Sequence, residues 1–84
     1  MTHEIIIRES FANAILVGDK TFEIRNYDRG YQRGDFVRFV AVDNTLTEIP
    51  FHPILSKKYE ITYVLSGWGI ENEFVVFSIK EVEG

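Results

Sequence analysis

The chain has 84 residues, the size of one small domain, so we expect residues 1–84 to form a single domain. It contains no cysteine, which excludes disulfides, thiolate metal sites and cysteine nucleophiles. Its net charge of −4 argues against an extended nucleic-acid coat surface, which would need a basic face. Because no apolar run approaches the ~18 residues of a membrane span, we expect a cytoplasmic domain with no membrane partner.

The first two elements are predicted to be a strand and a short helix. The β-branched run Glu4–Arg8 is typical of a buried strand. Ser10 is a favourable N-cap, and Gly18 is well placed to end the helix in a left-handed conformation. Phe11 and Ile15 share one helical face, which we expect to pack on a sheet.

The segment Thr21–Arg25 alternates between apolar and polar residues, which predicts a half-buried strand. We expect Phe22 and Ile24 to point inward. Glu23 and Arg25 would then project together from the outer face.

The second half of the chain is rich in aromatic and β-branched residues, which predicts strands at Phe36–Val42, Lys57–Leu65 and Phe74–Val82. The segment Asp43–Ser56 holds both prolines and is expected to be a long connection or a broken edge hairpin. The fold class is therefore mainly β (α+β), with five to six strands and one short N-terminal helix. So many strands in a short chain bury themselves best as a small β-barrel, with the helix plugging one end.

Positive charge is concentrated in one segment of this acidic chain. Four of the five arginines lie within fourteen residues: Arg25, Arg29, Arg33 and Arg38. Either an ordinary surface of mixed charge or a local anion site explains this clustering. Both interpretations remain open at this point.

The strongest chemical pattern is Gly18-x-Lys20-x-x-Glu23-x-Arg25. It places a lysine, a carboxylate and a guanidinium beside a helix end, where they can recognise a phosphate, a carboxylate or a base edge. Taken by itself, the spacing favours a plain surface ion pair between Glu23 and Arg25 over a ligand site.

This pattern resembles the GxKxxExR signature of the ASCH domain family at all four marked positions. The order of elements around it also resembles a small bacterial and phage branch of unknown function in that group. The resemblance implies a PUA-like β-barrel. It also implies a cleft, lined by Gly18, Lys20, Glu23 and Arg25, that binds RNA, a nucleotide or a modified nucleoside.

Further residues extend this predicted site. Arg29 and Arg33 add positive charge, and Trp68, between two glycines, either stacks on a base or folds back as a lid over the barrel end. We favour the lid. Tyr27 and Tyr31 flank Arg29, a pattern that suits base stacking and core coverage equally well.

Three functions are compatible with the sequence. We expect a binding module for RNA, single-stranded nucleic acid or a nucleotide or nucleoside, acting as a monomer or weak homodimer. The alternative is a small amidohydrolase on an acylated cytidine-type nucleoside, with Lys20 and Glu23 as catalytic residues. ASCH proteins with that activity carry threonine at the position of Glu23, so the resemblance favours binding over catalysis. A protein-interaction accessory domain is the third.

No cofactor or metal is expected. The chain has only two histidines, His3 and His52, and they lack the close spacing of a zinc site. His52 is predicted to be a loop residue.

Overall fold

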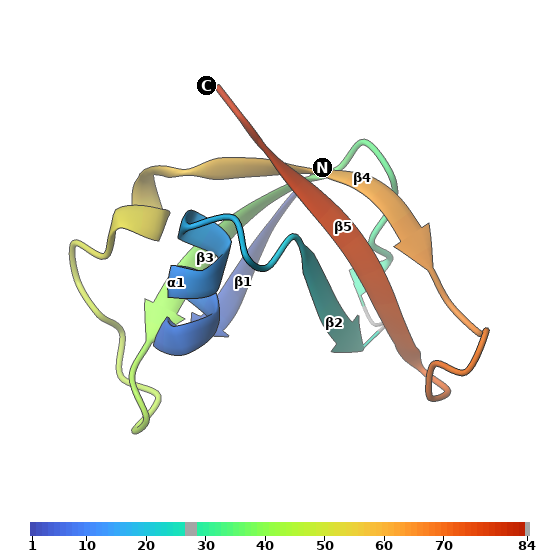
Figure 1. Ribbon diagram of the computed structural model, residues 1–84, viewed down its shortest axis with the longest axis horizontal. Helices are drawn as coiled ribbons and strands as arrows, with labels where there is room; N and C mark the ends of the chain where they lie inside the picture. The colour runs from blue at the N-terminus through green and yellow to red at the C-terminus, as the bar shows by residue number, and fades with distance from the viewer. Residues whose placement is uncertain (27–28, 84) are drawn as a thin grey trace.

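The computed structural model describes residues 1–26 and 29–83. Within these ranges the chain forms five strands, one α-helix and a short 3₁₀ helix (Figure 1). The elements are β1 (Thr2–Arg8), α1 (Glu9–Leu16), β2 (Phe22–Asn26), β3 (Phe36–Val42), η2 (Pro53–Ser56), β4 (Lys58–Leu65) and β5 (Phe74–Val82).

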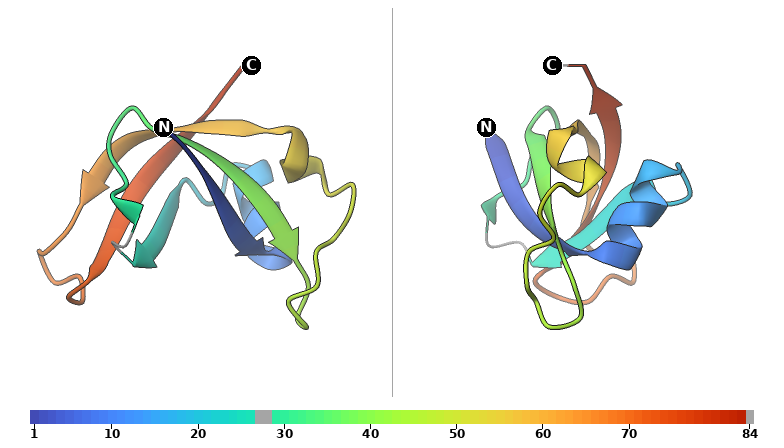
Figure 2. Two further views of the ribbon diagram at one scale, coloured as in Figure 1. Left: turned by 180° about the vertical axis from the view of Figure 1, so that it is seen from behind. Right: turned by 90° about the vertical axis from the view of Figure 1, so that its left-hand side faces the viewer.

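The described strands form one sheet in the order β1-β3-β4-β5-β2. β1 pairs parallel with β3, whereas the other neighbours are antiparallel. The sheet bends into two arms, one holding β1 and β3 and the other β4, β5 and β2, and α1 lies between them (Figures 1 and 2). The mainly-β prediction with five strands and one short helix is confirmed. The barrel is a half-barrel, because β1 and β2 stand at the two edges of the sheet and do not pair with each other.

The core lies on the concave side of this half-barrel. Strand alternation directs every second side chain inward, and α1 and η2 cover the arm formed by β1 and β3. The largest fully buried side chains come from all parts of the sheet except β2, and from η2: Ile5, Ile7, Val37, Phe39, Ile54, Ile61, Val75 and Phe77.

α1 begins one residue before the predicted cap. Its N-cap is Arg8, which makes no side-chain capping hydrogen bond, and Ser10 lies in the first turn, so the Ser10 prediction is wrong. The buried residues of the helix are Ala12 and Ile15, whereas Phe11 is half exposed. The buried face of the helix is therefore centred on Ala12 and Ile15 and does not include Phe11.

Gly18 ends the helix as predicted, with φ +85°. Its N–H donates to the carbonyl of Ile15 at 3.1 Å. The N–H groups of Asp19 and Lys20 both donate to the carbonyl of Ala14, at 3.0 and 3.1 Å. These bonds reverse the chain and fix where Lys20 enters the region before β2.

The inward and outward faces of β2 are the reverse of the prediction. Glu23 is 3% exposed, whereas Phe22 and Ile24 are 43% and 54% exposed. The alternation is present, but the prediction of which face points inward is wrong. Glu23 can be buried because two cations neutralise its carboxylate. An edge strand beside an open seam also leaves its apolar side chains accessible.

The segment from 43 to 56 is a long connection, one of the two expected alternatives, and it ends in η2. Asp43 Oδ1 accepts hydrogen bonds from the backbone of Thr45 and Thr47 at 2.8 and 3.0 Å, and Val42 and Glu48 form a single antiparallel bridge. His52 is a loop residue, but a buried one. Its Nε2 lies 3.0 Å from Asn13 Oδ1 and its Nδ1 accepts the N–H of Ile54 at 3.2 Å, which ties the loop to α1.

No helix in the described ranges is long and apolar enough to cross a membrane.

Candidate functional site

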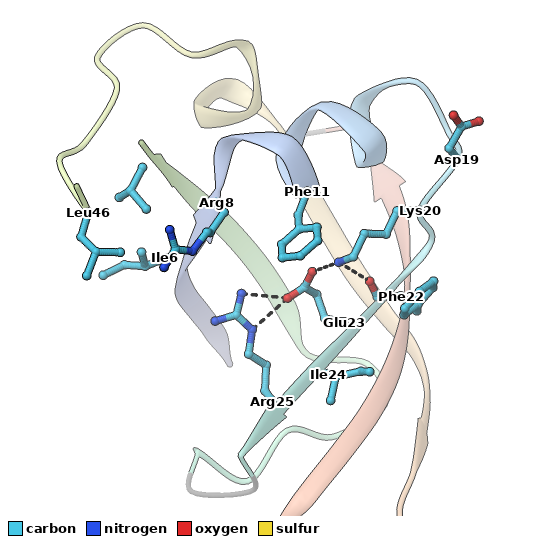
Figure 3. Close-up of a pocket in the computed structure, with 11 residues that line it drawn as sticks. Ile6, Arg8, Phe11, Asp19, Lys20, Phe22, Glu23, Ile24, Arg25 and Leu46 are labelled. Atoms are coloured by element: carbon cyan, nitrogen blue, oxygen red, sulfur yellow. Dashed lines mark hydrogen bonds and ion pairs between the residues drawn. The ribbon is translucent and has the colours of Figure 1, made fainter. Parts of the chain in front are cut away.

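Lys20, Glu23 and Arg25 form a charged triad around the buried carboxylate. Lys20 Nζ donates to Glu23 Oε1 and also to the carbonyl oxygen of Phe22, the latter at 2.8 Å. Arg25 donates through Nε to Glu23 Oε2 at 2.8 Å, and its Nη2 lies 2.8 Å from the same oxygen. Figure 3 shows Glu23 held between the two cations.

This arrangement leaves donors available on both cations. A lysine ammonium has three donors, and Lys20 uses two of them within the protein. An arginine guanidinium has five, and Glu23 engages only its Nε and Nη2 groups. Glu23 therefore positions two cations that can still donate to a ligand.

The triad lies at an open pocket of about 620 Å³ at the seam between the two edge strands (Figure 3). The walls come from β1, the first turn of α1, the connection from α1 to β2, β2 itself, the end of β3 and the following loop. The lining residues are Ile6, Arg8, Phe11, Asp19, Lys20, Phe22, Glu23, Ile24, Arg25, Val42 and Leu46. The volume is within the usual range of small-molecule sites.

The pocket wall is largely apolar and accessible. Ile6, Phe11 and Leu46 are exposed rather than packed in the core. Lys20 Nζ lies 5.3 Å from the ring centre of Phe11 and 5.2 Å from that of Phe22, within cation–π range. Aromatic faces beside charged donors can accommodate a flat, polar-edged ligand.

Arg8 is a pocket residue that the sequence did not reveal. It lies at the end of β1, far along the chain from the motif, and is exposed. Its side chain makes no ion pair or hydrogen bond with any residue that the structure describes. No local spacing pattern connects it to Lys20 or Arg25, because the proximity arises from the curvature of the sheet.

The other predicted ligand residues lie outside this pocket. Gly18 shapes the turn before Lys20 and borders a separate hollow. Arg29 donates through Nη1 to the carbonyl of Glu4 on β1, and Arg33 is exposed and does not line the pocket. The structure thus brings together Lys20, Glu23 and Arg25 but not Gly18, Arg29 or Arg33.

Trp68 does not cover the barrel end. Its side chain is 91% exposed, with φ +55°, and it does not line the pocket. The preferred interpretation of this residue as a lid is therefore wrong. Trp68 and the glycines on both sides of it all have positive φ, and the turn that they form leaves the side chain exposed.

Tyr31 is a core residue, not a stacking residue on the surface. Its ring lies 4.8 Å from those of both His3 and Phe77. Tyr27, its predicted counterpart, lies outside the described residues.

His3 forms a second buried polar contact, on the opposite edge strand. Its Nε2 lies 2.8 Å from Asp35 Oδ2, and the N-terminal ammonium lies 3.5 Å from Asp35 Oδ1. The hydrogen bond from His3 is the main cause that lowers the pKa of Asp35, while partial burial opposes it. Within the described ranges, no group of three or more acidic, histidine or cysteine side chains is arranged to hold a metal ion.

Together the fold and pocket define a small mainly-β half-barrel with a charged and aromatic cleft at its open seam. The chain belongs to a family described as "Domain of unknown function (DUF3850)", which matches residues 2–79. No curated protein matches it. Its fold is similar to the crystal structure of hypothetical protein PH0355, with a TM-score of 0.64 and 16% identity over 98% of this chain and all of the other. At that identity the likeness concerns the fold alone.

Proposed function

We propose that this domain is a noncatalytic binding module of the ASCH, PUA-like type that holds a nucleotide, a modified nucleoside or one residue of single-stranded RNA. The observation that carries the proposal is the convergence of Lys20, Glu23 and Arg25 in one open pocket with aromatic walls. The resemblance of the motif to the ASCH signature supports the same class of ligand.

The chemistry of the pocket fits a base with a polar edge. Arg25 and Lys20 retain donors that can reach ring nitrogens or carbonyl oxygens, and Phe11 and Phe22 offer apolar surface to a planar ring. A purely structural ion pair would not need exposed aromatic side chains around it.

The net charge of the chain favours a small ligand over a long nucleic acid. A net charge of −4 disfavours a long basic groove, because binding along a nucleic-acid backbone depends on several neutralising cations. One compact pocket with a local excess of donors suits a single nucleotide unit. A free nucleotide and an RNA segment offer that same unit.

The direct test replaces the triad without leaving a buried charge. The triple variant Lys20→Met, Glu23→Leu, Arg25→Met removes the polar groups while keeping similar volumes, a change that folded domains often tolerate. The matched control is Arg38→Gln, which lowers the net charge by the same single unit at an exposed position away from the pocket.

Binding is measured by calorimetric titration at low salt with the four nucleosides, their monophosphates and short single-stranded RNA. We expect saturable binding to the intact domain and to Arg38→Gln, and none to the triple variant, with circular dichroism confirming that all three are folded. Absence of binding to the intact domain, or equal binding by the triple variant, overturns the proposal.

A second candidate, an amidohydrolase on an acylated cytidine, is favoured by one observation. Lys20 and the buried Glu23 are in direct contact at the pocket, where they can exchange a proton beside a bound substrate. Chromatography of acylated cytidine incubated with the domain tests this candidate. Turnover that disappears in Lys20→Met and persists in Arg38→Gln would favour it, whereas turnover no higher than in Lys20→Met would exclude it.

A further inference from the structure

Arg8 and Arg25 reach the pocket from the two strands that border the open seam. Arg8 is the last residue of β1 and Arg25 belongs to β2, the strand at the other edge of the sheet. Both line the same cavity, and Figure 3 shows their guanidinium groups on the same side of Glu23.

The positive charges that line the pocket are not all paired with anionic side chains of the protein. Glu23 is shared by Lys20 and Arg25, so its carboxylate already has two cationic partners. Asp19 also borders the pocket, but Figure 3 shows its carboxylate pointing away from the triad. Arg8 has no anionic partner within the part of the chain that the structure describes.

We propose that Arg8 and Arg25 together bind the phosphate group of the ligand. This inference rests on the proposed function and sharpens it, because it specifies a phosphorylated ligand, a nucleotide unit rather than a bare nucleoside. Phosphate offers several oxygens in a tetrahedral arrangement, so it can accept hydrogen bonds from two guanidinium groups that approach from different strands.

The rest of the pocket then has a defined role. The phosphate lies on the side bordered by Arg8 and Arg25. Phe22 lies on the Lys20 side of Glu23, and the ring of Phe11 lies beside Glu23, between Arg8 and Lys20 (Figure 3). A nucleotide can therefore extend from the arginine pair toward the aromatic side chains, with Glu23 between its two ends. Arg8 thereby joins β1 to a site whose recognisable motif is confined to the segment from Gly18 to Arg25.

The test compares cytidine, cytidine 5′-monophosphate and inorganic phosphate on the intact domain and on Arg8→Gln, by calorimetry at low salt. For the intact domain we expect the monophosphate to bind about tenfold or more tightly than the nucleoside, as charge-assisted hydrogen bonds to phosphate imply. Arg8→Gln should remove most of that difference, because it should weaken binding of the monophosphate much more than binding of cytidine. Arg38→Gln is the matched control, because it removes one exposed arginine of β3 outside the pocket.

Arg8→Lys separates charge from geometry. It keeps the positive charge but loses the planar fork, so it should recover only part of the phosphate preference. A short single-stranded RNA with and without a 5′-phosphate then distinguishes a terminal phosphate from an internal one as the source of the group.

The outcomes separate this inference from the proposed function. If the nucleoside binds and its phosphate adds no affinity, or if Arg8→Gln keeps the full phosphate preference, the arginine pair is not the phosphate site and only this inference fails. If neither nucleoside nor nucleotide binds the intact domain, both are overturned.

Discussion

Two buried polar side chains stand on the two edge strands of the half-barrel, and they have different surroundings. His3 of β1 is enclosed, with its ring against Tyr31 and its Nε2 on Asp35. Glu23 of β2 is as deeply buried, but its partners Lys20 and Arg25 line an open pocket. Neither region leaves a described buried side-chain polar atom without a hydrogen bond.

The difference separates a structural contact from a site. The His3 cluster, comprising His3, Tyr31 and Asp35, connects β1 to the segment before β3, and its only exposed component is part of Asp35. In the charged triad the carboxylate is enclosed, whereas the side chains of Lys20 and Arg25 are partly exposed, by 15% and 28%, and line the open pocket. A buried anion that positions two accessible cations is suited to binding a ligand, whereas an enclosed pair contributes mainly to stability.

The largest effect is expected when Glu23 loses both partners. The double variant Lys20→Ala, Arg25→Ala leaves a buried carboxylate without compensation, which should lower the free energy of unfolding by about 3–5 kcal/mol. Urea denaturation followed by circular dichroism measures this loss. The triple apolar variant described above should recover most of the stability but not the binding. If the triple variant is as unstable as the double variant, the unpaired carboxylate is not the cause.

A smaller loss is expected in the His3 cluster, without any effect on binding. His3→Ala removes the hydrogen bond to Asp35 and the ring contact with Tyr31, and should lower the free energy of unfolding by about 2–3 kcal/mol. Its nucleotide affinity should equal that of the intact domain. His3→Gln keeps a donor for Asp35 and should recover part of the loss. A fall in nucleotide affinity in a folded His3→Ala would remove the distinction between the two regions.

The same cluster should make stability depend on pH in the acid range. Because the folded-state pKa of Asp35 lies below its ordinary value of 3.8, Asp35 stabilises the fold above that pH. This contribution is lost as the pH falls through the lower folded-state value. Asp35→Asn should therefore be less stable than the intact domain near neutral pH, and the difference should shrink below pH 3.8.

Urea midpoints measured across the acid range give this comparison. Asp43 needs its own control, Asp43→Asn, because the hydrogen bonds from Thr45 and Thr47 lower its pKa as well. A stability difference between Asp35→Asn and the intact domain that stays constant down to the most acid pH would contradict the role of Asp35.

Much of the secondary structure could be predicted from the sequence, because local residue patterns determine where strands and helices begin and end. The bounds of β5 follow the predicted run Phe74–Val82, and Gly18 ends the helix as its position indicated. Which face of β2 is buried could not be predicted from the sequence. Alternation shows that two faces differ, but burying Glu23 depends on Lys20 and Arg25 folding back on it.

The candidate site could be predicted only in part, for a similar reason. Lys20, Glu23 and Arg25 are close in sequence, so a motif can identify them. Arg8 belongs to the site only because the half-barrel brings the end of β1 and the middle of β2 to one pocket. Tyr31 was ambiguous for the converse reason, since its burial depends on His3 and Phe77, both distant in sequence.

The smallest effect is expected at Trp68, an aromatic residue that belongs to neither region. Because its side chain is almost fully exposed, Trp68→Ala should change the free energy of unfolding by less than about 0.5 kcal/mol. The affinity of this variant for cytidine 5′-monophosphate should also be unchanged, because Trp68 does not line the pocket that holds the charged triad. Urea denaturation and calorimetry measure both quantities, with Phe11→Ala as the aromatic control that does line the pocket and should weaken binding. Weaker monophosphate binding by Trp68→Ala would mean that the ligand extends beyond the seam between β1 and β2.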